Sequence, residues 1–298
     1  MNADQKRAYL ILHICVFIWG FTAILGNLIS LQETVLVWYR MGITSVSLLF
    51  IPALWSNIKN VPKKEILKIA GIGVLVALHW ITFYGAIKYS VVSVALTALA
   101  TTSFFTSFIE PLFMKTKIKF WEVLSGAAII PAIYLIFYFT GEYKIGFILG
   151  LLSALLAAIF SVLNKKMIAK HHAVPITFIE LSCGFIFLCV SMPVYFQIFE
   201  DVTLLPTQKD WFYLCILSVL CTTIPFILSL NSLRHLSAFT SNITINLEPV
   251  YGILLASAIF KDHKNLHTGF YFGAGIILLI VFLNPLINKY FNKRNPVN

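Results

Sequence analysis

The chain has 298 residues, of which 59% are hydrophobic and 11% are charged, and its formal net charge is +10. Soluble domains carry about 25% charged residues, so this composition excludes an ordinary soluble protein. The positive charge does not indicate nucleic-acid binding, because the lysines and arginines lie in short clusters between apolar runs. We therefore expect a lipid bilayer, and no nucleic acid, around this chain.

Ten apolar runs follow one another along the chain, each about as long as the 20 residues that a bilayer-spanning helix needs. Short connections with turn residues separate them and leave no room for a separate domain. The first run has no small-residue cleavage site after it, which indicates a span and not a removed signal peptide. The sequence thus predicts an all-α integral membrane protein with ten transmembrane helices. The runs cover approximately residues 8–29, 34–55, 66–86, 91–114, 120–140, 145–164, 174–197, 210–231, 237–260 and 268–288.

The basic residues are divided unequally between alternate connections. Of the 22 Lys and Arg residues, sixteen lie in one set of connections, five lie in the other set, and Arg40 lies inside a span. Connections rich in Lys and Arg remain in the cytoplasm. The sequence therefore predicts that both termini are cytoplasmic and that the protein lies in the inner (plasma) membrane.

The two halves of the chain carry similar segments. Residues 84–95 and 230–241, which are 146 positions apart, each show a basic residue, a ring and then small residues leading into an apolar run. Each half has five spans, and because five is odd the second half must enter the membrane from the opposite side. The sequence thus predicts two inverted five-helix repeats, residues 1–143 and 144–298, with a substrate site near the midplane between them.

The ninth run contains the most unusual polar residues. Glu248 lies about eleven residues into it, near the midplane, where a charged side chain costs about 2.5–3.5 kcal/mol. Pro249 has no N–H to donate to the Ile245 carbonyl, so the helix is expected to be kinked or opened there. Asn246 precedes this pair. These features predict that the run lines a central cavity, although a carboxylate that caps freed backbone groups is the alternative.

Two further spans carry ionisable residues with similar alternatives. Arg40 matches a substrate carboxylate or phosphate, but it also suits a structural ion pair with Glu248 or a position at the outer interface. His79, followed by Trp80, lies near the midplane of the third run. It could bind substrate or carry a proton, or be a hydrogen-bonded interior histidine.

Two more carboxylates lie near the cytoplasmic ends of their spans. Glu110 stands close to Lys115, which favours local pairing or a helix-end role. Glu180 is a candidate for an inner gate with a lysine or with His13.

Hydroxyl and aromatic side chains complete the candidate site. Thr101 belongs to a series of Thr and Ser residues four apart in the fourth span, which either line a polar pathway or bond to backbone and neighbouring helices. Trp19, Trp80 and Tyr251 are candidates for aromatic walls. The predicted substrate-binding residues are Glu248, Arg40, His79, Trp80, Trp19, Thr101, Asn246 and Tyr251, and the predicted gating or structural polar residues are Glu110, Glu180 and Pro249.

No catalytic, metal or cofactor site is expected. The five cysteines lie inside apolar runs without metal-ligand spacing, and we find no phosphate-cradling glycine loop, nucleophile elbow or His box. Gly146 and Gly150 have the GxxxG spacing that allows close helix packing, which permits a homodimer without establishing one.

Several short motifs together resemble the EamA-like branch of the drug/metabolite transporter superfamily. They are Ile18-Trp-Gly-Phe21, Trp38-Tyr-Arg40, Ala86-Ile-Lys-Tyr-Ser90, Leu233-Arg-His-Leu-Ser-Ala238 and Leu247-Glu-Pro249. The resemblance covers residues 8 to 288, and it departs from the family pattern at Thr102-Ser103, which pair with Glu248-Pro249.

The resemblance implies a secondary transporter that works by alternating access on a small organic metabolite, with export favoured over import. An amino acid or a similar amphiphilic solute is favoured. The alternatives are a flippase for a lipid-linked substrate and, from a different class, a membrane-embedded enzyme or receptor.

Overall fold

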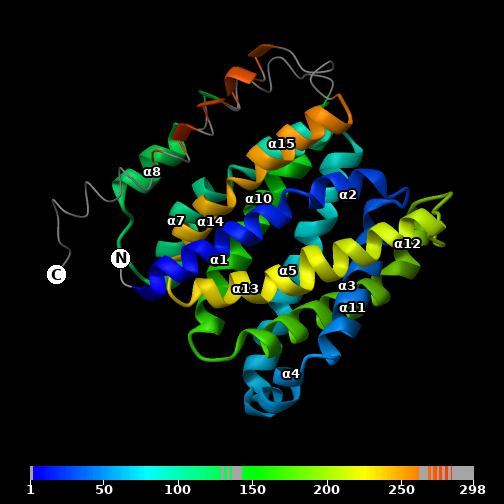
Figure 1. The fold of residues 1–298 in the computed structure, drawn as a ribbon, viewed down its shortest axis with the longest axis horizontal. Helices are drawn as coiled ribbons and strands as arrows, with labels where there is room; N and C mark the ends of the chain where they lie inside the picture. The colour runs from blue at the N-terminus through cyan, green and yellow to red at the C-terminus, as the bar shows by residue number, and fades with distance from the viewer. Residues whose placement is uncertain are drawn as a thin grey trace.

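The computed structural model describes residues 3–128 and 143–261, with the isolated positions 131–132, 135, 268–269, 271–273, 275–276, 279–280 and 283. Within these residues the fold is all-helical, and the helices form one bundle (Figure 1). The first half contains α1 (Ala3–Trp19), α2 (Thr22–Leu28), α3 (Glu33–Leu49), α4 (Pro52–Asn57), the short helix η1 (Ile58–Asn60), α5 (Lys63–Lys88), α6 (Val92–Leu99), α7 (Thr102–Met114) and α8 (Phe120–Ala127). The second half contains α10 (Lys144–Ile168), α11 (Ala173–Ile198), α12 (Gln208–Cys215), the π-helix η3 (Ile216–Thr223), α13 (Ile224–Leu233), α14 (Ala238–Ile245) and α15 (Glu248–Ile259).

The described helices account for eight of the ten predicted spans. Seven helices or joined helices are long and apolar enough to cross a membrane, and an eighth is added if α3 and its continuation after a 79° bend form one span. The other two predicted spans, 120–140 and 268–288, are described only in part, the first of them by α8 and a few isolated positions. A multi-pass helical protein is thus confirmed, while the number ten and the orientation of the termini stay predictions.

The helix boundaries repeat with the offset seen in the sequence. α6 begins at Val92 and α14 at Ala238, and the helices that follow them, α7 and α15, begin at Thr102 and Glu248. Both pairs are 146 residues apart. Thr102 and Glu248 therefore hold equivalent places, each as the first residue after a helix break.

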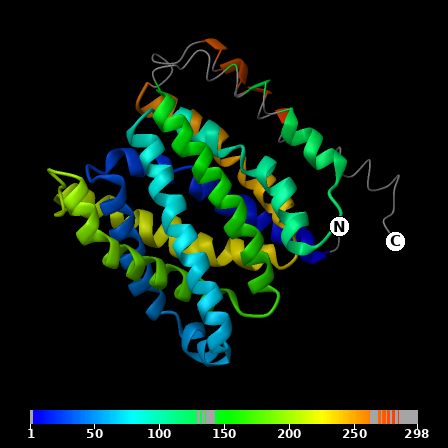
Figure 2. The same cartoon turned by 180° about the vertical axis from the view of Figure 1, so that it is seen from behind.

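Contacts between the halves are also reciprocal. α1 packs along α13, and the equivalent pair is α10 with α5, which run side by side in Figure 2. Likewise α6 packs against α15, and α7 packs against α14. Each contact thus occurs twice with the halves exchanged, as expected for two repeats related by a pseudo-twofold axis.

Three of the spans are broken near their middle, between α1 and α2, between α6 and α7, and between α14 and α15. At each break the chain tightens to an i→i−3 hydrogen bond, donated by the N–H groups of Phe21, Thr101 and Leu247. The predicted opening of the ninth span is therefore present, but it precedes Pro249. This proline lies in the first turn of α15, where its missing N–H removes no intrahelical hydrogen bond.

Glycines allow two of the closest approaches between helices. A Cβ at Gly150 of α10 would lie 2.6 Å from the Cβ of Ala98, and one at Gly20 would lie 2.7 Å from the Cβ of Tyr251. Gly146, one turn before Gly150, lies equally close to Ser90. This GxxxG pair packs within the chain, so its spacing gives no support to a homodimer.

Candidate functional site

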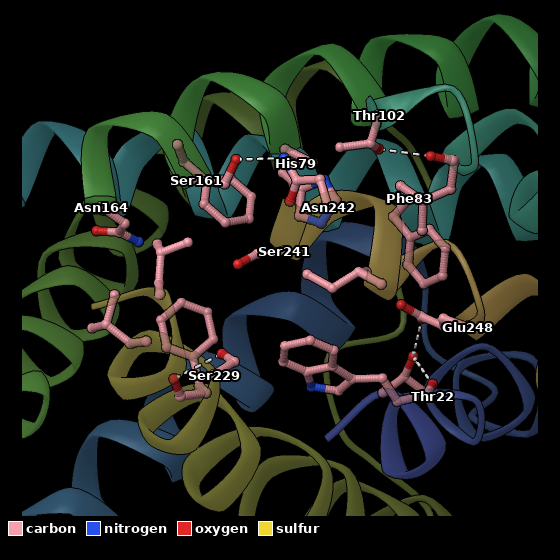
Figure 3. A pocket seen from close by; sticks show the side chains of 18 of the residues that line it. Thr22, His79, Phe83, Thr102, Ser161, Asn164, Ser229, Ser241, Asn242 and Glu248 are labelled. Atoms are coloured by element: carbon pink, nitrogen blue, oxygen red, sulfur yellow. Dashed lines mark hydrogen bonds between the residues drawn. The ribbon is translucent and has the colours of Figure 1, made fainter. Parts of the chain in front are cut away.

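A cavity of about 130 Å³ lies between the two halves, beside the broken helices (Figure 3). An engineered cavity of about 150 Å³ accepts benzene, so this one has room for a solute of similar size. Most of the lining is apolar, and aromatic rings form part of it. The polar side chains that line it are Thr22, Arg40, His79, Thr102, Ser161, Asn164, Ser229, Ser241, Asn242, Asn246 and Glu248.

Arg40 of α3 reaches the cavity from a buried position. Its Nε donates to Thr222 Oγ1 at 2.9 Å, and its Nη1 donates to the Tyr84 hydroxyl at 2.7 Å. Its guanidinium carbon lies 3.8 Å from the centre of the Trp80 ring, within the range of a cation–π interaction. These contacts fix the plane of the guanidinium and use only part of its five N–H donors.

Glu248, the first residue of α15, lies on the same cavity. It is 7% exposed, and its Oε1 accepts a hydrogen bond from Thr22 Oγ1 at 3.3 Å. Thr22 begins α2, and its single hydroxyl hydrogen is shared between Glu248 and the Trp19 carbonyl oxygen, which lies 2.8 Å from Oγ1. Glu248 therefore stands where two of the helix breaks meet.

The predicted ion pair between Arg40 and Glu248 does not form. Among the described residues the ion pairs within 4.0 Å are Lys68–Glu65 and Lys119–Glu122, and neither lies in the cavity. The hydrogen-bond partners of Arg40 are instead neutral: Thr222 accepts from its Nε and Tyr84 accepts from its Nη1. Arg40 and the carboxyl group of Glu248 thus line one cavity without contacting each other.

His79 of α5 is both hydrogen-bonded and at the cavity. Its Nδ1 lies 2.9 Å from the Ser153 carbonyl oxygen and 2.8 Å from the Ser153 hydroxyl oxygen. Nδ1 donates to Ser153 in one tautomer and accepts from its hydroxyl in the other. The ring packs against Phe83 and Phe160. His79 is therefore a hydrogen-bonded interior histidine that also lines the cavity, so its two predicted roles do not exclude each other.

Two asparagines of the ninth span join the halves. Asn246 Nδ2 donates to the Ala100 carbonyl and to Ser103 Oγ, both at 2.8 Å, and so bridges the two equivalent helix breaks. Asn242 Nδ2 donates to Thr106 Oγ1 and Ser161 Oγ, both at 2.7 Å.

Of the other predicted substrate-binding residues, Trp19 and Trp80 line the cavity. Thr101 and Tyr251 are not part of its lining. The Thr101 hydroxyl bonds to the Ala98 carbonyl, whereas its neighbour Thr102 lines the cavity. A step of one residue turns a side chain by about 100° around a helix, which accounts for the difference. Tyr251 packs edge-on against Phe17 of α1.

The predicted gating residues have distinct positions. The carboxylate of Glu110 accepts hydrogen bonds from the N–H groups of Ala238 and Phe239, at 3.0 and 2.7 Å, and so caps α14. A helix-end role is one of the two expectations for Glu110, but the helix end that it contacts belongs to α14 and not to its own helix, α7. Glu180 bonds to Asn164, and not to a lysine or to His13, whose Nδ1 bonds to the Tyr9 carbonyl.

Sequence reasoning missed several lining residues, notably Thr22, Ser161, Asn164, Ser229 and Ser241. Asn164 is an amide at the cytoplasmic end of the predicted sixth run, next to Lys165, where a polar residue is ordinary and gave no signal. Single hydroxyls such as Ser229 are common in membrane helices and gave no signal.

A multi-pass helical protein with two repeats around a shared cavity has the architecture of a membrane transporter. The model of the EamA-like transporter family matches residues 6–138 and 144–285, so the chain belongs to this family and is a membrane transporter.

A curated relative is also described as a transporter, and a solved structure shares the fold. The chain is 23% identical over 199 residues to a Bacillus subtilis (strain 168) protein described as "Uncharacterized transporter YxxF", and the match covers 65% of this chain and 62% of that protein. A solved structure titled "Crystal structure of protein" superposes with a TM-score of 0.67 at 14% identity, over 95% of this chain and 99% of that one. This likeness concerns the fold alone.

Proposed function

We propose that the protein is a secondary transporter that moves a small organic metabolite across the inner membrane by alternating access of the two repeats. The observation that carries this proposal is the placement of Arg40 and Glu248 on one cavity between the halves without an ion pair. A charge buried without a partner is costly, and such residues in membrane spans usually serve function.

An amphiphilic solute such as an amino acid suits this lining best. Among the described residues, Nη2 of Arg40 makes no hydrogen bond within the chain, which leaves it for an anionic group of the solute. Glu248 can receive an amine, and the rings of Trp19, Trp80 and Phe83 cover the apolar part. A volume of about 130 Å³ limits the solute to a few heavy atoms beyond these charged groups.

The same proposal covers the direction of transport and holds that the solute is moved without being chemically changed. Family resemblance favours export. The cavity offers binding groups, and the role we assign to it is translocation without bond making or breaking.

The test is a thermal-shift screen of the detergent-purified full chain against amino acids, nucleotides, sugar phosphates and polyamines. A ligand that binds only the folded state stabilises it by about 2.7 kcal/mol at 100 times its Kd. Glu248→Gln and Arg40→Gln should reduce the shift to about half or less at the same ligand concentration. Glu200→Gln and Arg7→Gln, which change exposed residues, are the matched controls and should retain it.

A solute found in this way should then be carried into sealed proteoliposomes by the native chain. A shift that stays undiminished in both cavity variants would refute the site. The failure of every solute class would refute the small-solute proposal and point to lipid-linked substrates.

A further inference from the structure

A second buried carboxyl group lies close to the cavity but does not line it. Glu180 is on α11, and none of its surface is exposed. Its Oε2 accepts one hydrogen bond, from Asn164 Nδ2 of α10, at 3.3 Å. Its Oε1 is buried and has no hydrogen-bond partner among the described residues.

No positive charge compensates this carboxyl group. No Lys, Arg or His nitrogen of the described residues lies within 4.0 Å of it. α4 and α13 pack against α11 and carry no titratable side chain. In the interior of the other elements packed on α11, the titratable side chains bond elsewhere: Arg40 on α3, His79 and Tyr84 on α5, and Lys165 on α10.

The unpartnered atoms are explained by one missing hydrogen. Asn164 Oδ1 is also buried without a partner, and it belongs to the same amide that donates to Glu180. A carboxylic acid and a primary amide can form a cyclic pair, in which the amide N–H donates to one oxygen and the acid O–H donates to the amide oxygen. A proton on Glu180 Oε1 therefore supplies the donor that both Oε1 and Asn164 Oδ1 lack.

The surroundings connect this pair to the cavity. Asn164 lines the cavity, so the carboxyl group lies one side chain away from it. On the α5 side the backbones approach closely, because a Cβ at Gly73 would collide with the Glu180 carbonyl oxygen. We therefore assign the cavity as the route by which a proton reaches Glu180.

We propose that Glu180, paired with Asn164, is a proton-binding site beside the cavity, and that its proton exchange is coupled to solute movement. The step is a proton transfer from a hydronium ion in the cavity to Glu180 Oε1, which leaves a water molecule, and release returns the proton to water and leaves the carboxylate. The binding of the proton stands on this geometry alone, whereas the coupling rests on the proposed transport function.

Infrared spectroscopy of the detergent-purified full chain tests the binding of the proton. The carbonyl band of a buried carboxylic acid should be present in the native protein and lost in Glu180→Gln, which keeps the shape of the neutral acid. Glu200→Gln, an exposed control, should retain the band. Asn164→Leu should shift the band, since it removes both hydrogen bonds, and this variant decides the matter if Glu180→Gln does not fold.

Two results would overturn the proton site. One is a native spectrum from which Glu180→Gln removes no band. The other is a band that added sodium chloride abolishes at constant pH, which would identify a sodium site in its place.

Transport in proteoliposomes tests the coupling. With a solute found in the screen, uptake by the native chain should rise under an imposed pH gradient, while Glu180→Gln should exchange the solute but lose the response to the gradient. A variant that keeps the response refutes the coupling. If no solute moves at all, the proposed transport function is refuted. The infrared experiment then still decides whether Glu180 binds a proton.

Discussion

Replacing Arg40 by Met separates a binding role from a structural one. If Arg40 serves solute binding, its buried charge is a burden to the fold, and a methionine of similar length should remove transport without unfolding the protein. The native contacts that would be lost are the hydrogen bonds to Tyr84 and Thr222 and the contact with the Trp80 ring.

The free-energy costs and gains of Arg40→Met nearly cancel. The loss of the Trp80 contact costs about 2 kcal/mol for a desolvated cation–π pair, and an unpaired Tyr84 hydroxyl costs about 1–3 kcal/mol. Thr222 is less affected, because its hydroxyl still donates to the Leu217 carbonyl. Removing a buried charge that has no carboxylate partner returns several kcal/mol. We expect the stability of Arg40→Met to lie within about 2 kcal/mol of native, which corresponds to about 4–8 °C in Tm at most.

A double-mutant cycle sharpens the test. Tyr84→Phe in the native background removes a hydrogen bond to a charged group, at a cost of about 1.5–3 kcal/mol. In the Arg40→Met background the same change removes an unpaired hydroxyl and should be neutral or stabilising. The assay is thermal unfolding of all four purified proteins, with solute uptake measured in parallel. An Arg40→Met protein that unfolds far below this range, or a Tyr84→Phe cost equal in both backgrounds, would refute the reasoning.

Three further predictions concern the frame of the site. Glu110→Ala should lower the stability by about 2 kcal/mol, because it removes the carboxylate that accepts from the first two N–H groups of α14, while Ser237 keeps its bond to the Thr240 N–H; thermal unfolding measures this, and an unchanged Tm would contradict the capping role. Gly150→Ala should cost about 1–3 kcal/mol through overpacking against Ala98, whereas Gly71→Ala, which meets nothing within 4 Å, is the matched control and should not destabilise; equal Tm values would show that the helices separate freely. Asn246→Leu leaves the Ala100 carbonyl and Ser103 without their shared donor, at about 1–3 kcal/mol, and should slow uptake more than it lowers solute binding; a variant with native uptake would mean that the bridge between the helix breaks has no part in transport.

The sequence singled out the ionisable residues that the structure brings together, because charges are rare in apolar spans and therefore conspicuous. Arg40, His79 and Glu248 come from three different spans, and all three line one cavity. The offset of 146 residues also reappears as equivalent helix starts at Thr102 and Glu248.

The sequence did not indicate which side of each helix faces the cavity. Thr101 and Thr102 are adjacent and chemically identical, and only the packed structure distinguishes which of them faces the cavity. The break before α7 contains no proline or glycine, so no local signal marks it. Partner choice was equally hidden, since Arg40 bonds to Tyr84 and Thr222 and not to the carboxylate that charge alone would favour.

The central claim is that Arg40 and Glu248 form the binding site of a transported solute. The most direct measurement is the uptake, into sealed proteoliposomes, of a solute that stabilises the native chain, compared among native, Arg40→Met, Glu248→Gln and the exposed control Arg7→Gln. Loss of an interaction with a charged group of about 1.5–3 kcal/mol corresponds to about a 10- to 150-fold weaker affinity. The account predicts that loss in both cavity variants and native uptake in Arg7→Gln. Folded cavity variants that take up the solute with native affinity would contradict it.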